Sequence, residues 1–156
     1  MRILSAILVL CCTLSFAADL GSEISDQVSR KMDAIGDAME QAALNNDYDT
    51  ILSNYTDDVI IMADFQEPIR GKSALRAIYK SEAQRMLKYH AFSGKYEKRW
   101  EQGGYIYEYG SFGMTVSTRD DKKPSGYYGS YFQICEPVGT SYKVKYVIWN
   151  LDHNPY

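Results

Sequence analysis

Glu108, Asp64 and His90 are the side chains whose types and positions could support acid–base chemistry. Glu108 lies in the segment YIYEYGSFGM, where an alternating pattern places it on one strand face with Ile106 and Phe112. A carboxyl group enclosed by apolar walls suits a general acid or base that works near neutral pH. The alternative is a cross-strand ion pair with a neighbouring cation such as Arg99 or Lys98.

Asp64 and His90 are the weaker catalytic candidates. Asp64 directly follows the apolar run VIIMA and precedes a turn, which indicates a loop acid. His90 begins a predicted strand, where it could move protons at a pocket mouth or act as a simple hydrogen-bond partner. We therefore assign no catalytic residue from the sequence.

Metal and cofactor sites are not expected. The chain has two histidines, His90 and His153, and no pair of His and Cys residues has the spacing of metal ligands. Cys135 lies in the apolar segment YFQIC, so a buried, inert thiol is the favoured interpretation and an intermolecular disulfide the alternative.

The composition indicates one globular domain. The chain has 156 residues, of which 46% are hydrophobic and 24% charged, and its formal net charge is −3. This charge and the lack of any block of Lys and Arg argue against nucleic acid or an anionic membrane as a partner.

The first residues are typical of a secretory signal peptide. Arg2 supplies a basic start, an apolar stretch follows, and small residues stand at the cleavage site, so we expect residues 1–17 to be removed. Cleavage one residue later, after Ala18, is the alternative. We predict a secreted protein with a single domain, 18–156, and no membrane attachment after cleavage. Asn54-Tyr55-Thr56 is then a candidate glycosylation site at Asn54.

Helices are predicted in the first half of the chain. Apolar residues recur at steps of four and three over 22–44, which indicates a helix with one buried stripe. A short helix over 48–53 follows, and a third begins near Gly71 with an inner face of Leu75, Ile78, Tyr79 and Met86. Between them, 59–63 reads as a buried strand.

Long strands fill the second half of the chain. Alternating patterns cover 90–100, 105–118, 126–135 and 142–151, with turns at 102–104, 119–125 and 137–140. Helices followed by a meander of strands indicate an α+β domain in which helices cover one face of a curved sheet.

The order and spacing of several motifs resemble the nuclear transport factor 2-like superfamily, and within it the SnoaL-like, ketosteroid-isomerase-like branch. The motifs are YTDD, IRGKSAL, GGYIYEYGSF, GYYGSYFQI and YKVKYVIWN. The resemblance implies a cone: a strongly curved, mostly antiparallel sheet wrapped round three helices, with a pocket at its open end. It also implies a dimer and either an enzyme or a non-enzymatic binder, since the superfamily contains both.

The resemblance also implies where catalytic acids would stand. Steroid isomerases place the proton-shuttling acid at the position of Ala63, and many relatives carry an acid on the last strand at the position of Val147. Neither residue is acidic here. Asp64 stands one residue beyond, where a strand would point it to the opposite face unless a bulge restores the register.

These observations favour a non-catalytic binder of a small apolar or aromatic molecule. We expect the ligand pocket to be lined by Met62, Tyr79, Trp100, Glu108, Phe112 and Tyr131. The alternatives are an isomerase, cyclase or dehydratase that uses Glu108 with a tyrosine donor, or a dimeric protein-interaction domain with a filled cone. Tyr105, Tyr107 and Tyr109 share the strand face opposite Glu108, and we predict that this face forms a homodimer.

Overall fold

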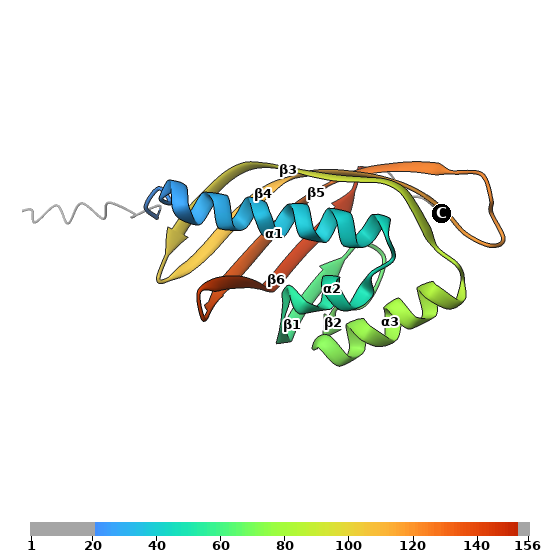
Figure 1. Ribbon diagram of the computed structural model, residues 1–156, viewed down its shortest axis with the longest axis horizontal. Helices are drawn as coiled ribbons and strands as arrows, with labels where there is room; N and C mark the ends of the chain where they lie inside the picture. Colours follow the sequence, from blue (N-terminus) through green and yellow to red (C-terminus); the bar gives the residue numbers. More distant parts are fainter. Residues whose placement is uncertain (1–20, 153–156) are drawn as a thin grey trace, which may run out of the picture.

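The computed structural model describes residues 21–152, which form helices packed on one curved sheet (Figure 1). The predicted signal peptide, residues 1–17, lies outside the described residues. The elements in chain order are α1 (Asp26–Leu44), α2 (Tyr48–Ser53), β1 (Tyr55–Ala63), β2 (Ile69–Arg70), α3 (Lys72–Gln84), β3 (Lys88–Gln102), β4 (Tyr105–Ser117), β5 (Ser125–Val138) and β6 (Ser141–Leu151).

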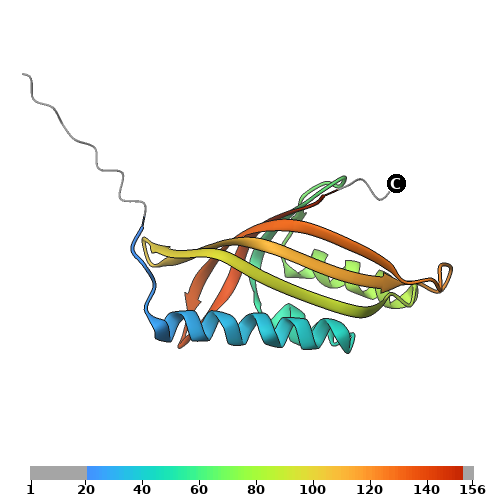
Figure 2. The same ribbon diagram turned by 90° about the horizontal axis from the view of Figure 1, so that it is seen from above.

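The sheet is mixed and open. Its strand order is β2-β1-β6-β5-β4-β3, with β1 and β6 parallel and the other neighbours antiparallel. The helix α1 crosses its concave face, and α3 lies below the long strands near the β1–β2 edge (Figures 1 and 2). The predicted α+β cone is confirmed, while the short strand β2 was not predicted.

Apolar periodicity determines how α1 packs. Ser25 caps its first turn by accepting a hydrogen bond from the Val28 amide at 3.3 Å. Met32 and Ala42 are buried, and Ile24, Val28, Ile35 and Met39 pack against the same core. The predicted stripe therefore faces the sheet, although the helix begins at Asp26 rather than at Ser22.

Glycines permit close approach of strands where the sheet bends. A Cβ at Gly129 would lie 2.0 Å from the Asn150 carbonyl oxygen, and a Cβ at Gly110 would lie 2.1 Å from that of Lys95. No side chain fits at either position. The two glycines therefore allow the backbones of neighbouring strands to approach closely.

A β-bulge in β3 changes which side chains face the core. Tyr96 pairs with Gly110 and Lys98 with Tyr109, so Glu97 is the extra residue. Before the bulge, Phe92 lies on the concave face with Met114. After it, Arg99 lies on that face opposite Glu108, and Trp100 faces outward opposite Tyr107.

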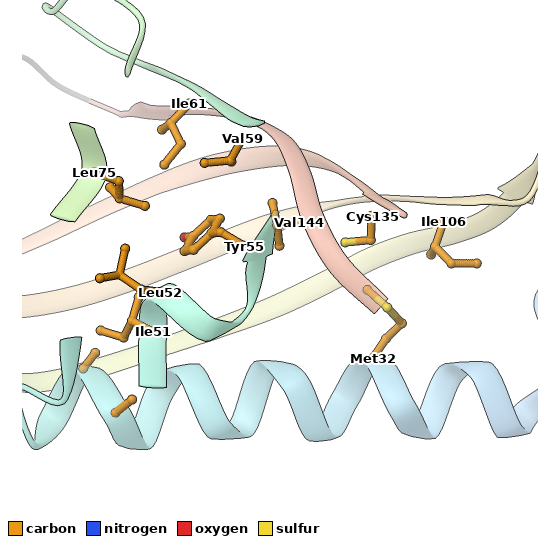
Figure 3. Packing of buried hydrophobic residues seen from close by; sticks show 12 residues of the cluster. Met32, Ile51, Leu52, Tyr55, Val59, Ile61, Leu75, Ile106, Cys135 and Val144 are labelled. Atoms are coloured by element: carbon orange, nitrogen blue, oxygen red, sulfur yellow. The ribbon is translucent and has the colours of Figure 1, made fainter. Parts of the chain in front are cut away.

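The hydrophobic core runs along the concave face of the sheet. Figure 3 shows Met32 of α1 beneath Ile106 and Cys135, and Leu52 and Leu75 at the other end with Tyr55 between. Met86, predicted to lie on the inner face of the third helix, instead follows α3 with a positive φ and is 58% exposed. The helix ends before that residue, which the pattern alone did not show. Within residues 21–152, no helix is both long and apolar enough to cross a membrane.

Candidate functional site

Glu108 is the centre of a buried polar network on the concave face. The residue is 3% exposed. Its Oε2 accepts a hydrogen bond from Arg99 Nε, and its Oε1 accepts bonds from the Tyr131 hydroxyl at 2.6 Å and from Gln133 Nε2 at 2.9 Å. The network spans three neighbouring strands. Arg99 of β3 pairs with Glu108 of β4, and Glu108 pairs with Gln133 of β5, so the strand register brings these side chains together.

Arg99 joins this network to α1. Its Nη1 donates to Asp33 Oδ1 at 2.6 Å and to the Ser29 carbonyl at 3.2 Å, and the Tyr96 ring lies 3.7 Å from its guanidinium carbon. Burial lowers the pKa of Arg99, but the bonds to Glu108 and Asp33 outweigh this effect and the net shift is upward. The ion pair with Arg99 is therefore the observed environment of Glu108, one of the alternatives drawn from the sequence.

The Tyr131 hydroxyl is a poor proton donor to any substrate. Burial and its bond to Glu108 raise the pKa of Tyr131. The hydroxyl already donates to the carboxylate, so its proton is engaged. Three donors bind the Glu108 carboxylate, and Arg99 links it to α1. This arrangement suits a network that holds the strands and α1 in place rather than one that transfers protons.

Tyrosines form a second polar cluster between α2, α3 and the start of β3. Tyr48 and Tyr79 stack with ring centroids 5.0 Å apart. Tyr89 packs edge-on against Phe92 at 5.9 Å, and these side chains border the core. Burial raises the pKa of Tyr48, Tyr79 and Tyr89, and it raises that of Tyr55 to about 12.

Glu82 of α3 belongs to this tyrosine cluster. Its charge acts on Tyr48, Tyr79 and Tyr89. Among residues 21–152, its buried Oε2 has no hydrogen-bond partner. Burial raises the pKa of Glu82, against a smaller opposing effect of Arg85.

A surface hollow borders the same tyrosine pair. It has a volume of about 290 Å³ and is lined by residues of α2, α3 and the preceding turn. The apolar and aromatic part of the lining is Tyr48, Leu52, Tyr79 and Ala83, and the polar and charged part is Asn46, Asp47, Asp49, Arg76 and Lys80. A second hollow of about 310 Å³ lies at the start of β1, where Asp57, Asp58, Lys72 and Lys143 surround Thr56. Neither of these two hollows is lined by Glu108.

Comparison with known proteins identifies the fold. No protein-family model matches the chain, and no curated protein matches it in sequence. A ketosteroid isomerase-like protein from Erwinia carotovora atroseptica SCRI1043 superimposes with a TM-score of 0.71 at 13% identity, covering 84% of this chain and 100% of that one. The chain has the nuclear transport factor 2-like fold.

Other solved structures agree with this assignment. A nuclear transport factor 2-like protein of unknown function from Shewanella oneidensis MR-1 matches with a TM-score of 0.63 at 9% identity, covering 78% of this chain and 98% of that one. A candidate scytalone dehydratase from Novosphingobium aromaticivorans DSM 12444 matches with a TM-score of 0.68 at 11% identity, covering 82% and 87%. The resemblance read from the sequence motifs is confirmed at the level of the fold, and such identities support the fold alone.

The nuclear transport factor 2-like cone separates the predicted pocket residues. Glu108, Phe112 and Tyr131 lie on the concave face, and Phe112 contacts Trp149 there at 6.1 Å between ring centroids. Tyr79 belongs to the tyrosine cluster of α2 and α3. These residues come from the concave side, but they do not border one common hollow among those described above.

Met62 and Trp100 are corrections to the predicted lining. Met62 lies on the convex face, where it pairs with Ile148, which is 46% exposed. Side chains alternate along β1, and Val59 and Ile61 occupy the concave face. Trp100 lies on the convex face because the bulge at Glu97 shifts the pattern by one residue. The sequence prediction assumed strict alternation along β3, which would place Trp100 on the same face as Phe92.

Asp64 and His90 both make local contacts. The Asp64 carboxylate accepts a hydrogen bond from the Leu151 amide at 2.6 Å and so joins the end of β1 to β6. Exposed His90 shares a 2.8 Å hydrogen bond between its Nε2 and Ser117 Oγ. Ala63, beside Asp64, pairs with Trp149 on the concave side, so the position implied by the resemblance carries a methyl group.

The tyrosines predicted to form a dimer interface lie on the convex face. Tyr107 stacks on Trp100 at 5.4 Å, and Phe132 packs near both rings at 6.2 and 6.4 Å. Tyr105 and Tyr109 are 37% and 39% exposed beside them. We call Trp100, Tyr105, Tyr107, Tyr109 and Phe132 the convex aromatic patch.

Sequence reasoning missed Tyr48, which lines the hollow, and Glu82 of the tyrosine cluster. Glu82 stands seven residues after Leu75 and three after Tyr79, so it falls on the inner stripe of α3. An acid on an apolar stripe is the signal that would have identified it. Asn54, the candidate glycosylation site, caps α2 and donates its side-chain amide to the Thr50 carbonyl at 2.9 Å.

Proposed function

We propose that the protein is a secreted homodimer that binds a small apolar or aromatic molecule and does not use Glu108 for catalysis. The observation that carries the binding proposal is the open hollow of about 290 Å³ beside the stacked Tyr48 and Tyr79 rings. Its volume is near the lower end of the range for small-molecule sites. Aromatic rings supply large apolar contact area at a low cost in conformational entropy.

The environment of Glu108 supports a non-catalytic role. A general base needs a lone pair that reaches the substrate. Here the carboxylate accepts bonds from Arg99, Tyr131 and Gln133, and its side chain is almost fully buried. An isomerase, cyclase or dehydratase would have to break this network before it could use Glu108 with Tyr131.

Native mass spectrometry of the protein purified from its own secretory route tests ligand binding. We expect extra mass that denaturation releases. Tyr79→Ala should lose the extra mass, whereas Tyr79→Phe keeps the ring and should retain it. Extra mass in neither the wild type nor Tyr79→Phe, with both folded by circular dichroism, would refute binding and favour the filled interaction domain.

The convex aromatic patch supports the homodimer proposal. Contiguous aromatic rings are uncommon on a sheet face that is exposed to water alone, and such a patch typically marks an interaction surface. Tyr107→Asp should dissociate the dimer in sedimentation experiments because it buries a charge without a partner. Lys122→Asp, in the exposed turn between β4 and β5, is the matched control and should leave the dimer intact. Sedimentation of the wild type as a monomer would contradict this proposal.

Secretion and glycosylation have separate tests. Amino-terminal sequencing should find Ala18 or Asp19 as the first residue, and an intact Met1 would disprove signal cleavage. If Asn54 carries a glycan, glycosidase treatment should lower the mass of the secreted protein, and Asn54→Gln should abolish that change.

A further inference from the structure

The charged side chains that line the hollow between α2 and α3 differ in how far their hydrogen bonds are already used. Two acids, Asp47 and Asp49, and two cations, Arg76 and Lys80, belong to this lining, so the formal charges cancel. Their hydrogen bonds do not cancel in the same way. The groups that remain available determine which charge on a ligand the hollow can accommodate.

Both acids of the lining already accept hydrogen bonds. Asp47 caps α2: its Oδ1 accepts from the Thr50 amide at 3.1 Å, and its Oδ2 accepts from the Thr50 hydroxyl at 2.6 Å. Asp49 Oδ1 accepts from Arg76 Nη1 at 2.7 Å. A cationic ligand would therefore share either carboxylate with a donor that the chain already supplies. Glu82, nearby on α3, does not line this hollow, and burial raises its pKa.

The two cations of the lining have unused donors. Arg76 and Lys80 lie about one turn apart on α3, so they share one helix face. A guanidinium presents several N–H donors, and within residues 21–152 only Nη1 of Arg76 has an acceptor. Lys80 is exposed, and among the same residues its ammonium group has neither an ion-pair partner nor a hydrogen-bond acceptor. Unused donors and an unpaired positive charge suit an anionic group.

The aromatic part of the lining lies beside these donors. Tyr79 and Ala83 precede and follow Lys80 on α3, and Tyr48 of α2 stacks on Tyr79 with the ring centroids 5.0 Å apart. Lys80 belongs to the lining itself, so a ligand that rests on the rings also meets this side chain. The flexible stem of a lysine lets its ammonium group follow a charged tail at the rim. The hollow therefore combines an apolar surface with a donor for one anionic end.

We propose that the ligand is a small aromatic carboxylate, whose ring packs against Tyr48 and Tyr79 and whose carboxylate accepts hydrogen bonds from Lys80. This inference rests on the proposed function and specifies its ligand class. A neutral molecule of the same shape gains the ring contacts alone. An amine of the same shape meets carboxylates that already have donors.

Matched probes separate the contribution of the carboxylate from that of the ring. Hydrocinnamate, hydrocinnamyl alcohol and hydrocinnamylamine share a phenyl ring and differ in the charge of the tail. Calorimetric titration of the full mature protein at low salt and neutral pH should show that hydrocinnamate binds about fivefold more tightly than the alcohol, with the amine weakest. Because Lys80 is exposed, added salt should weaken this preference and leave binding of the alcohol unchanged.

Two variants of single lysines test whether Lys80 is the cation responsible. Lys80→Gln keeps most of the side-chain stem and should reduce the preference for the acid over the alcohol to about onefold, while the alcohol still binds. Lys122→Gln removes the same charge in the exposed turn between β4 and β5, away from the hollow. It should preserve the preference of about fivefold, which excludes a general effect of net charge.

The outcomes distinguish the ligand class from the binding function. Equal binding of acid and alcohol to the wild type, tighter binding of the amine, or an unchanged preference in Lys80→Gln would overturn the carboxylate proposal and leave the binding function standing. Failure of all three probes to bind folded wild-type protein would overturn both.

Discussion

Two glutamates, the buried Glu108 and the partly buried Glu82, have opposite environments. Glu108 accepts hydrogen bonds from Arg99, Tyr131 and Gln133. Glu82 has a buried oxygen without a partner among the described residues, and its charge acts on Tyr48, Tyr79 and Tyr89. A buried carboxylate whose hydrogen bonds are satisfied holds structure together, whereas a buried carboxylate oxygen without a partner costs free energy. The difference moves the candidate site from the middle of the sheet to the region between α2 and α3.

Arg99→Met should have the largest effect because it leaves Glu108 buried without a cation. Removing one partner of a buried ion pair costs about 3–5 kcal/mol. Chemical denaturation should report this loss in the free energy of unfolding. The double variant Arg99→Met with Glu108→Gln removes both charges and should recover part of the loss. A cost for Arg99→Met below about 1 kcal/mol would contradict a structural role for this pair.

Glu108→Gln should have the second largest effect. The amide keeps the shape of the carboxylate but loses its charge and part of its accepting capacity, and hydrogen bonds to charged groups contribute about 1.5–3 kcal/mol. The same denaturation experiment measures the loss. An unchanged free energy of unfolding would show that Glu108 is dispensable for the fold and would reopen a catalytic role.

Lys98→Ala should cost less than either, although Lys98 adjoins Arg99 on β3. Lys98 lies on the convex face with its Nζ 5.7 Å from the centre of the Trp100 ring. An exposed contact of this kind contributes about 0.5–1 kcal/mol. A loss as large as that of Arg99→Met would show that the two faces of β3 are not energetically separate.

Glu82→Gln should show the smallest effect, recognisable by its sign and its pH dependence. Burial raises the pKa of Glu82 above the ordinary value of 4.5, so the folded protein holds the proton more tightly than the unfolded chain. The resulting stabilisation is complete below the unfolded pKa and is lost as the pH rises through the folded pKa. Gln does not titrate, so Glu82→Gln should gain stability relative to the wild type as the pH rises above the ordinary value of 4.5.

Thermal melts across this pH range check the prediction. Glu97→Gln, which removes an exposed acid, is the control and should follow the wild-type curve. Parallel curves for Glu82→Gln and the wild type would show that Glu82 has no strained charge in the folded protein, in contrast to what the unsatisfied oxygen implies.

The sequence alone determined the fold and its longer elements, but neither the short strand β2 nor the end of α3. The four-and-three spacing of the α1 stripe, the β-branched run before Ala63 and the alternating segments after Tyr89 are local signals, and local backbone preference with burial of one face is sufficient to read them. The pairing of Glu108 with Arg99 was also accessible as one of two alternatives, because neighbouring strands place residues opposite one another.

Tertiary structure decided which side of the sheet each residue faces and which acid lacks a partner. The bulge at Glu97 moves Trp100 to the convex face, and a bulge depends on how β3 pairs with β4 rather than on the residues of β3 alone. The environment of Glu82 includes Tyr48, which is distant in sequence, and Tyr89 on the following strand, and these approach it only after α2, α3 and β3 pack together. Periodicity reports one element at a time, whereas a binding site is made where several elements meet.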